Sequence, residues 1–231
     1  MKLVVEFIKT GNMVYISHLD LTRLFLRVLR MSGLRPAYSH GFNPHPKMSM
    51  ALPLALGAHS FCELLEFDTA ETASLQEVEE ALLLVNERLP YGIRVTAWWV
   101  KPDFLSKSLA SLVSAGEYEF MCEGIKDASV LLESYFAKDS ITVIKYDKKK
   151  SAEKEKEIRS EMLSYRIVKN IRGRMFARVT LSANPGHTLN PFVFFEAFCR
   201  ASGFVDGALI PVITRTAILN ADGRLLKEIL G

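Results

Sequence analysis

Residues 2–33 read KLVVEFIKTGNMVYISHLDLTRLFLRVLRMSG, a strand-like segment followed by a helix-like one. The first eight residues, KLVVEFIK, are rich in Val, Phe and Ile, which favours a β-strand. Ser17 is a typical helix N-cap, and the acidic Asp20 follows three positions later. Gly33 is a typical helix end. We therefore expect a helix from Ser17 to Gly33, directly after the strand.

Three more extended segments and a helix are expected in the first hundred residues. Residues 34–56 are extended and interrupted by turn residues, and residues 61–68 (FCELLEFD) alternate like a strand. Residues 73–88 form an amphipathic helix pattern, and residues 92–100 (GIRVTAWWV) are strand-like again. The resulting order, β-α-β-β-α-β, is typical of a ferredoxin-like fold.

The second half of the chain repeats this element order without repeating the sequence. Strands are expected over residues 117–123, 141–146, 164–170, 174–183 and 212–219, and helices over residues 127–137 and 191–202. The charged run DKKKSAEKEKE, residues 147–157, is expected to be an exposed excursion. These patterns predict an α+β protein of tandem ferredoxin-like (βαββαβ) domains with mainly antiparallel sheets, the second elaborated by an extra hairpin. The predicted boundaries are 1–100 for the first domain, 101–116 for a linker and 117–231 for the second domain.

The composition excludes several classes of protein. The chain has 231 residues, of which 49% are hydrophobic and 24% charged, as in folded soluble proteins. No apolar run approaches the roughly 20 residues of a membrane span, and the charged first residues do not resemble a signal peptide. The three cysteines, Cys62, Cys122 and Cys199, are far apart, which predicts free thiols in a reducing compartment and excludes a zinc ribbon or an iron–sulfur cluster held by this chain alone. We expect a cytoplasmic protein with no membrane contact.

The net charge of +3 conceals an uneven distribution. Residues 1–60 carry seven Lys or Arg against two acids, a net of +5. Residues 61–100 carry a net of −6, and residues 141–178 a net of +7. Two basic regions separated by an acidic one indicate either a surface that faces an anionic partner or a set of solvated faces.

Three arginines form a stripe along the first predicted helix. Arg23, Arg27 and Arg30 are four and three residues apart, so they lie within about 60° of one another around the helix. Three planar guanidinium groups in a row suit successive phosphates or carboxylates. The alternative is a solvated face on which Asp20 pairs with Arg23.

The loop that follows, Tyr38 to Lys47, reads YSHGFNPHPK. Pro44 and Pro46 stiffen the backbone on both sides of His45, and rigid presentation of polar groups suits a binding loop. The candidate contacts to a phosphate or a base are Tyr38, Phe42, Asn43, His45 and Lys47. The alternative is a proline-stiffened connection between two elements.

Histidines are concentrated near the start of the chain, where His18 and His45 are candidates for general acid or base catalysis in RNA cleavage. His18 is also a candidate ligand-binding residue, together with Asp20. The histidine spacings match no metal motif, so no metal and no cofactor are predicted.

A second basic feature is the predicted hairpin around residues 164–183. Arg172 and Arg174 lie near its turn, and Tyr165 and Phe176 interleave with its cations. A basic ribbon that carries aromatic side chains can bind nucleic acid. The preceding Lys/Glu run is more typical of a solvated loop.

Several motifs together resemble one known family. The strings ISHLDLTR at residues 16–23 and GFNPHP at residues 41–46, with LPL at residues 52–54, are similar to the bacterial "radical SAM-linked protein" family. The resemblance extends over about the first 70 residues, and His40 departs from it where Gln is expected. It implies a radical SAM protein, fused to this domain or encoded beside it, as the partner. It implies no reaction for this chain.

These observations lead to one preferred hypothesis and two alternatives. The preferred hypothesis is a non-catalytic accessory of a radical SAM enzyme that binds RNA or presents a substrate through the arginine stripe and the loop. The first alternative is a metal-independent endoribonuclease or RNA-processing enzyme of tandem ferredoxin-like type. The second is a protein-interaction module that uses the acidic residues 61–87 or the basic regions.

Overall fold

The computed structural model describes residues 1–123, 126–147, 152–171, 174–203 and 212–231. It is a mixed α+β structure with mostly antiparallel pairing, and the chain divides into two compact units. Unit 1 contains Met1–Val113 and Ala217–Gly231, and unit 2 contains Ser114–Thr216. Residues 217–231, which the sequence predicts to belong to the second domain, cluster with residues 1–113 in unit 1. No helix among the described residues is long and apolar enough to cross a membrane.

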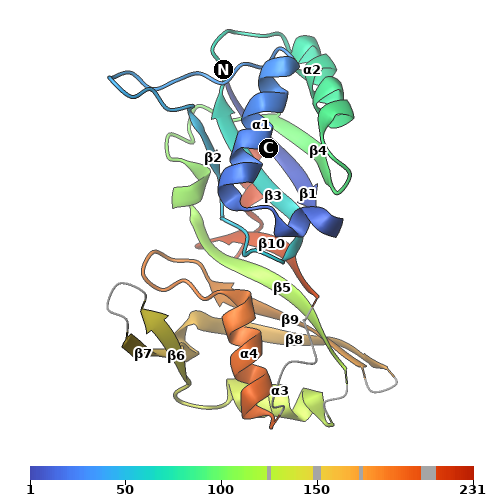
Figure 1. The fold of residues 1–231 in the computed structure, drawn as a ribbon, viewed down its shortest axis with the longest axis vertical. Helices are drawn as coiled ribbons and strands as arrows, with labels where there is room; N and C mark the ends of the chain where they lie inside the picture. The colour runs from blue at the N-terminus through green and yellow to red at the C-terminus, as the bar shows by residue number, and fades with distance from the viewer. Residues whose placement is uncertain (124–125, 148–151, 172–173, 204–211) are drawn as a thin grey trace. The chain divides into compact units, whose positions relative to one another are not determined.

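Unit 1 is built from an antiparallel sheet and two α-helices that lie side by side on one face of it (Figure 1). Its elements are β1 (Lys2–Lys9), η1 (Gly11–Tyr15), α1 (His18–Met31), β2 (Met48–Met50), β3 (His59–Asp68), α2 (Leu75–Arg88), β4 (Ile93–Val100), η2 (Leu109–Ser111) and η4 (Leu226–Leu230). The strand order is β4-β1-β3, with β2 also paired to β3, and all these pairs are antiparallel. β10 (Ile213–Asn220) follows β3 in the sheet order.

Local signals fix the helices of unit 1 where the sequence predicts them. The Ser17 side chain accepts a hydrogen bond from the backbone N–H of Asp20 at 3.1 Å, so the first turn of α1 is capped. At the start of α2, Ser74 and Glu77 form a complete capping box. Leu21, Phe25, Val28 and Leu29 of α1 are buried against the sheet, where the rings of Phe7 and Phe25 lie 4.7 Å apart. The opposite side of α1, which carries the arginines, is left exposed.

Unit 2 also contains two α-helices and a sheet. Its elements are β5 (Val113–Glu123), α3 (Ala128–Phe136), β6 (Thr142–Asp147), β7 (Ala152–Glu157), η3 (Arg159–Glu161), β8 (Met162–Ile171), β9 (Arg174–Ser182) and α4 (Pro191–Ala201). The strand order is β10-β5-β9-β8, and β6 and β7 form a separate two-stranded sheet. Asn190 caps α4 by accepting a hydrogen bond from the N–H of Phe192 at 2.8 Å, and Pro191 occupies the first turn.

Aromatic rings fill the core of unit 2. Phe120 of β5 makes edge contacts with Phe194, Phe195 and Phe198 of α4, at centroid distances of 6.0, 5.4 and 6.4 Å. Tyr135 of α3 packs on the same helix. Helices α3 and α4 therefore share one core against the sheet.

The charged run after residue 147 differs from the prediction. Residues 148–151 lie outside the described residues, but Ala152–Glu157 form strand β7, paired antiparallel with β6. The end of β7 is held in two ways. The next residue, Ile158, is completely buried, and Lys156 forms an ion pair with Glu161 at 2.6 Å. The alternating Lys and Glu side chains obscured the strand, because strands are usually recognised by their apolar residues.

Candidate functional site

Residues 37–47 form a narrow, hairpin-like arm, which we call the arm. Tyr38 and Pro46 face each other in an antiparallel bridge. The N–H of Ser39 donates to the carbonyl of His45 at 2.8 Å, and the N–H of His45 donates to the Ser39 hydroxyl at 2.9 Å. These bonds hold His45 in place between its two prolines. The arm is therefore an ordered structure and not an open loop.

Backbone hydrogen bonds attach the base of the arm to the end of β3. The N–H of Ala37 donates to the carbonyl of Asp68 at 2.7 Å, and the N–H of Asp68 donates to the carbonyl of Lys47 at 3.0 Å. The Lys47 ammonium group lies 3.8 Å from the Asp68 carboxylate. The arm is thus a rigid extension of the sheet, and Figure 1 shows it projecting from unit 1 beyond β2.

The tip of the arm presents polar and aromatic side chains to solvent. His40, Asn43 and His45 are exposed, and Phe42 is fully exposed. A phenylalanine in this position adds nothing to the core, so its ring is free to stack on a ligand.

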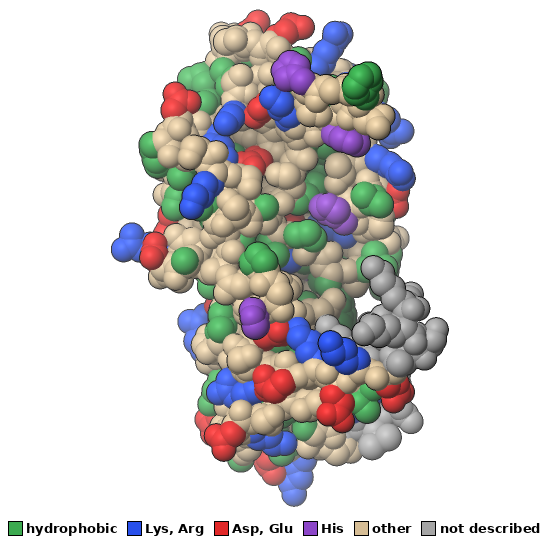
Figure 2. Space-filling view, turned by 90° about the vertical axis from the view of Figure 1, so that its left-hand side faces the viewer, with side chains coloured by type: hydrophobic (Ala, Val, Ile, Leu, Met, Phe, Trp, Pro, Cys, Tyr) green, Lys and Arg blue, Asp and Glu red, His purple; other side chains and the backbone are tan. Residues whose placement is uncertain are grey.

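One contact joins the arm to the arginine stripe. The guanidinium Nη2 of Arg30 donates to the Tyr38 hydroxyl at 2.5 Å, and the guanidinium carbon lies 5.4 Å from the centre of the Tyr38 ring. The C-terminal end of α1 and the base of the arm therefore form one surface. Figure 2 shows histidine, lysine and arginine side chains on the face of the molecule toward which the arm projects.

The other arginines of the stripe have different surroundings. Arg23 lies 3.2 Å from the Asp20 carboxylate, and both side chains are exposed, so this pair stabilises the helix only slightly. Arg27 is exposed and forms no ion pair with the described residues. Its charge lies between those of Arg23 and Arg30 along the stripe and is available to a ligand.

His18 lies at the other end of α1. Arg30 lies twelve positions further along the chain, about 18 Å along the helix axis. It is exposed, and its carbonyl accepts a hydrogen bond from the Thr22 hydroxyl at 2.9 Å. The structure therefore brings Arg30 to the arm and Asp20 to Arg23, but it does not bring His18 to the arm.

A cleft of about 450 Å³ opens at the foot of the arm, at a place that no sequence pattern indicates as a site. Lys101, which is buried here, lies 2.7 Å from the Glu66 carboxylate and donates to the carbonyl of Lys107 at 2.7 Å. Both carboxylate oxygens of Glu66 also accept from the N–H of Leu109. These groups satisfy one another and hold the segment after β4 in place. Glu66 and Lys101 are 35 positions apart in the chain, so no local pattern in the sequence predicts their pairing.

Two arginines of β9 in the β8–β9 hairpin are neutralised by acids of β5. Arg174 lies 2.8 Å from Glu123, and Arg178 lies 2.9 Å from Glu119. The Lys169 ammonium group lies 4.4 Å from the centre of the Phe176 ring. Arg172 lies outside the described residues. Because Arg174 and Arg178 are paired internally, this hairpin is a weaker anion site than the arm and the stripe.

Two of the three cysteines are unsuited to nucleophilic chemistry. Burial raises the pKa of the Cys122 thiol to about 12 and that of Cys199 to about 11. Both thiols are therefore protonated at neutral pH, and the thiolate is the reactive form. No group of three His, Cys, Asp or Glu within the described ranges is arranged to hold a metal ion.

The fold and this surface define a two-unit α+β protein that carries a rigid polar arm beside an arginine-striped helix. A family model described as "Uncharacterized protein conserved in bacteria (DUF2344)" matches residues 2–191, so the chain belongs to this bacterial family. The match includes the arm, the stripe and most of unit 2. The search of curated proteins found no match.

Proposed function

We propose that the protein is an RNA-binding accessory of a radical SAM enzyme. The contact between Arg30 and Tyr38 carries the proposal, because it makes the arginine stripe and the arm parts of one surface. Arg23, Arg27 and Arg30 would neutralise backbone phosphates. Phe42 would stack on an unpaired base, and Asn43 and His45 would donate or accept hydrogen bonds at its edge.

The architecture supports this role. The strand order β4-β1-β3-β2 in unit 1 and β10-β5-β9-β8 in unit 2 both correspond to the order 4-1-3-2 of a ferredoxin-like βαββαβ domain. We propose that both units are of this type, with the β6–β7 hairpin inserted in the second. A rigid sheet that carries a projecting arm keeps the binding groups in a fixed geometry before RNA arrives.

The radical SAM partner is proposed from the resemblance of the ISHLDLTR and GFNPHP motifs. The chemistry of the chain agrees with it, because the three cysteines are far apart and the cluster would be supplied by the partner. The neighbouring radical SAM protein, co-expressed with this chain, is expected to co-purify with it. Separate elution of the two proteins at low salt would contradict the partnership but not the RNA binding.

One observation favours a protein-interaction surface in unit 1. Leu75 and Leu83 of α2 are 60% and 62% exposed, among acidic side chains of the same helix. Apolar side chains presented on a helix are typical anchors for another protein. We assign the partner contact to this helix, and Leu83→Lys is expected to abolish co-purification while leaving RNA binding unchanged.

RNA binding is tested by the fluorescence anisotropy of a labelled single-stranded RNA across a salt series. The expected result is a dissociation constant that rises steeply with salt, since phosphate neutralisation releases counterions. The absence of binding at low salt, or binding without a salt dependence, would refute the proposal.

A further inference from the structure

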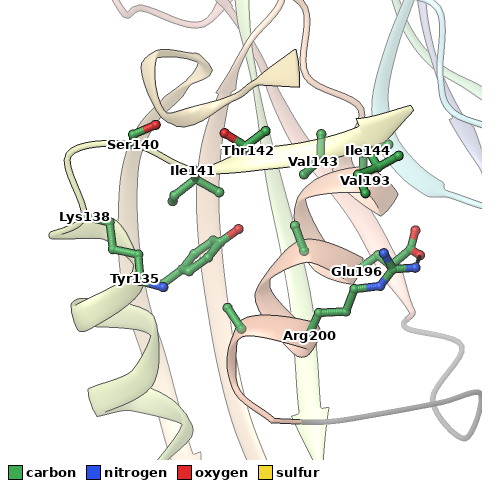
Figure 3. A pocket seen from close by; sticks show the side chains of 12 residues that line it. Tyr135, Lys138, Ser140, Ile141, Thr142, Val143, Ile144, Val193, Glu196 and Arg200 are labelled. Atoms are coloured by element: carbon green, nitrogen blue, oxygen red, sulfur yellow. Dashed lines mark hydrogen bonds and ion pairs between the residues drawn. The ribbon is translucent and has the colours of Figure 1, made fainter. Parts of the chain in front are cut away.

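Unit 2 contains a cleft of about 510 Å³ between β6 and α4, with the end of α3 at one side (Figure 3). Five consecutive residues, 140–144, line it. Side chains alternate between the two faces of a strand, so consecutive residues border one space only when the edge of the strand faces it. The free edge of β6 therefore forms one wall of the cleft.

The hydrogen-bond register of the β6–β7 hairpin shows which backbone groups lie on that edge. Ile158 donates to the carbonyl of Ile141 at 2.8 Å, and Val143 is paired with Lys156. In an antiparallel ladder hydrogen-bonded pairs alternate with non-bonded ones, so the N–H and C=O groups of Thr142 and Ile144 point away from β7. Within the part of the chain that the structure describes, β6 pairs with no strand other than β7.

The floor of the cleft holds a buried hydroxyl without a partner. Tyr135 is 3% exposed, and its hydroxyl forms no hydrogen bond with the described residues. Figure 3 shows its ring extending from α3 toward the space between β6 and α4. Burial raises the pKa of this phenol to about 12, so the hydroxyl keeps its proton and can donate it to an acceptor. A buried donor without an acceptor is unfavourable, and a ligand carbonyl would satisfy it.

The remaining walls are apolar, with charges at the rim. Val193 and Ala197 of α4 face the cleft, as does Ile141. Lys138 and Arg200 supply two cations at the rim, and the one acid there, Glu196, lies 2.5 Å from Arg200. The rim therefore carries net positive charge, which favours an acidic side chain on the ligand.

We propose that this cleft binds an extended peptide of another protein, which adds as a strand to the free edge of β6. The extended segment 140–144, whose last three residues belong to β6, spans about 15 Å, enough for four or five residues of the peptide. Main-chain bonds to Thr142 and Ile144 would supply affinity. The carbonyls on the opposite side of the peptide would point away from β6, and the hydroxyl of Tyr135, from α3, would donate to one of them. Aliphatic side chains of the peptide would pack against Val193 and Ala197, and an acidic side chain would meet Lys138, because Arg200 is already paired with Glu196.

The experiment selects random pentapeptides displayed on phage against the full-length protein. The expected peptides alternate aliphatic residues with others and contain an acidic residue. Ile144→Pro is the decisive variant, because its N–H is free of the β7 ladder and the proline ring blocks the edge. The affinity of Ile144→Pro for the selected peptides should be at least tenfold lower than that of the wild type, and Ile144→Ala should retain the wild-type affinity. Peptides that bind Ile144→Pro equally well, or a selection that enriches nothing, would overturn the proposal.

A second variant tests Tyr135 separately from folding. Tyr135→Phe removes an unpartnered hydroxyl, so its melting temperature should equal or exceed that of the wild type, while peptide affinity falls several-fold. A melting temperature that falls with unchanged peptide affinity would show a purely structural hydroxyl and contradict its role. A concentration-dependent dimer that Ile144→Pro dissociates would show that a second copy occupies the edge, and would also overturn the proposal.

Discussion

The guanidinium group of Arg30 and the phenol of Tyr38 form the contact that organises the candidate site. Arg30 donates a hydrogen bond to the Tyr38 hydroxyl at 2.5 Å and also lies 5.4 Å from the centre of its ring. The two residues come from different segments, the last turn of α1 and the base of the arm. Removing this contact should therefore loosen the arm without unfolding the helix.

Substitutions at Tyr38 should separate the two components of the contact. Tyr38→Phe removes the hydrogen bond and keeps the ring, and should lower the free energy of unfolding by about 1 kcal/mol or less. Tyr38→Ala removes both, and should speed hydrogen exchange at the amides of Ser39 and His45, which close the arm. Unchanged exchange in Tyr38→Ala would mean that the arm is held by its backbone bonds alone.

Phe42 should matter for binding and not for stability. Its side chain is fully exposed, so Phe42→Ala should change the free energy of unfolding by less than about 0.5 kcal/mol. Loss of base stacking should cost about 1–3 kcal/mol of RNA binding. Phe61→Ala, at another exposed phenylalanine, is the control and should leave RNA affinity unchanged. Equal effects of the two variants in anisotropy titrations would exclude stacking at the arm.

Gly92 should be intolerant of any side chain. Its φ is +97°, and a Cβ atom there would lie 2.4 Å from the carbonyl oxygen of Thr10. Gly92→Ala should destabilise unit 1 by at least about 1–3 kcal/mol from the backbone strain alone. Gly223 shares the positive φ, but nothing lies within 4 Å of a Cβ atom added there. The loss in free energy of unfolding, measured by chemical denaturation, should therefore be larger for Gly92→Ala than for Gly223→Ala, and the difference measures the steric clash.

The buried thiol of Cys122 should make stability fall at alkaline pH. Burial raises its pKa from 9.0 to about 12, so the unfolded chain loses this proton first. The stabilising contribution is complete below pH 9 and is lost as pH rises toward 12. The free energy of unfolding, measured from pH 8 to 10.5, should fall less steeply in Cys122→Ala than in the wild type. Identical slopes would show that this thiol is not shielded from solvent.

Local signals in the sequence predicted the α-helices well. The caps Ser17, Ser74 and Asn190 all act within a few residues of the helices they start, so neighbouring positions contain the information. Strand β7 was missed because its support comes from pairing with β6, which no local pattern reveals.

The candidate site was predictable in its residue types and not in its pairings. The sequence identified the arginine stripe and the arm separately, but only the fold brings Arg30 to Tyr38. The sequence also indicates Arg174 as a cation that could bind a ligand, whereas the register of β5 and β9 places Glu123 opposite Arg174. Cross-strand register depends on the whole sheet, so such neutralisation cannot be read from one strand.

The central claim, that the arginine stripe binds RNA phosphates, is tested most directly by the salt dependence of RNA affinity. Arg23, Arg27 and Arg30 are changed together to Gln, and a variant with Arg88, Arg94 and Lys107 changed to Gln carries the same net charge. For single-stranded RNA, losing three phosphate contacts should reduce the slope of log affinity against log salt by about 2. This reduction is expected for the stripe variant, and an unchanged slope is expected for the control. Equal slopes for the wild type and both variants would contradict it.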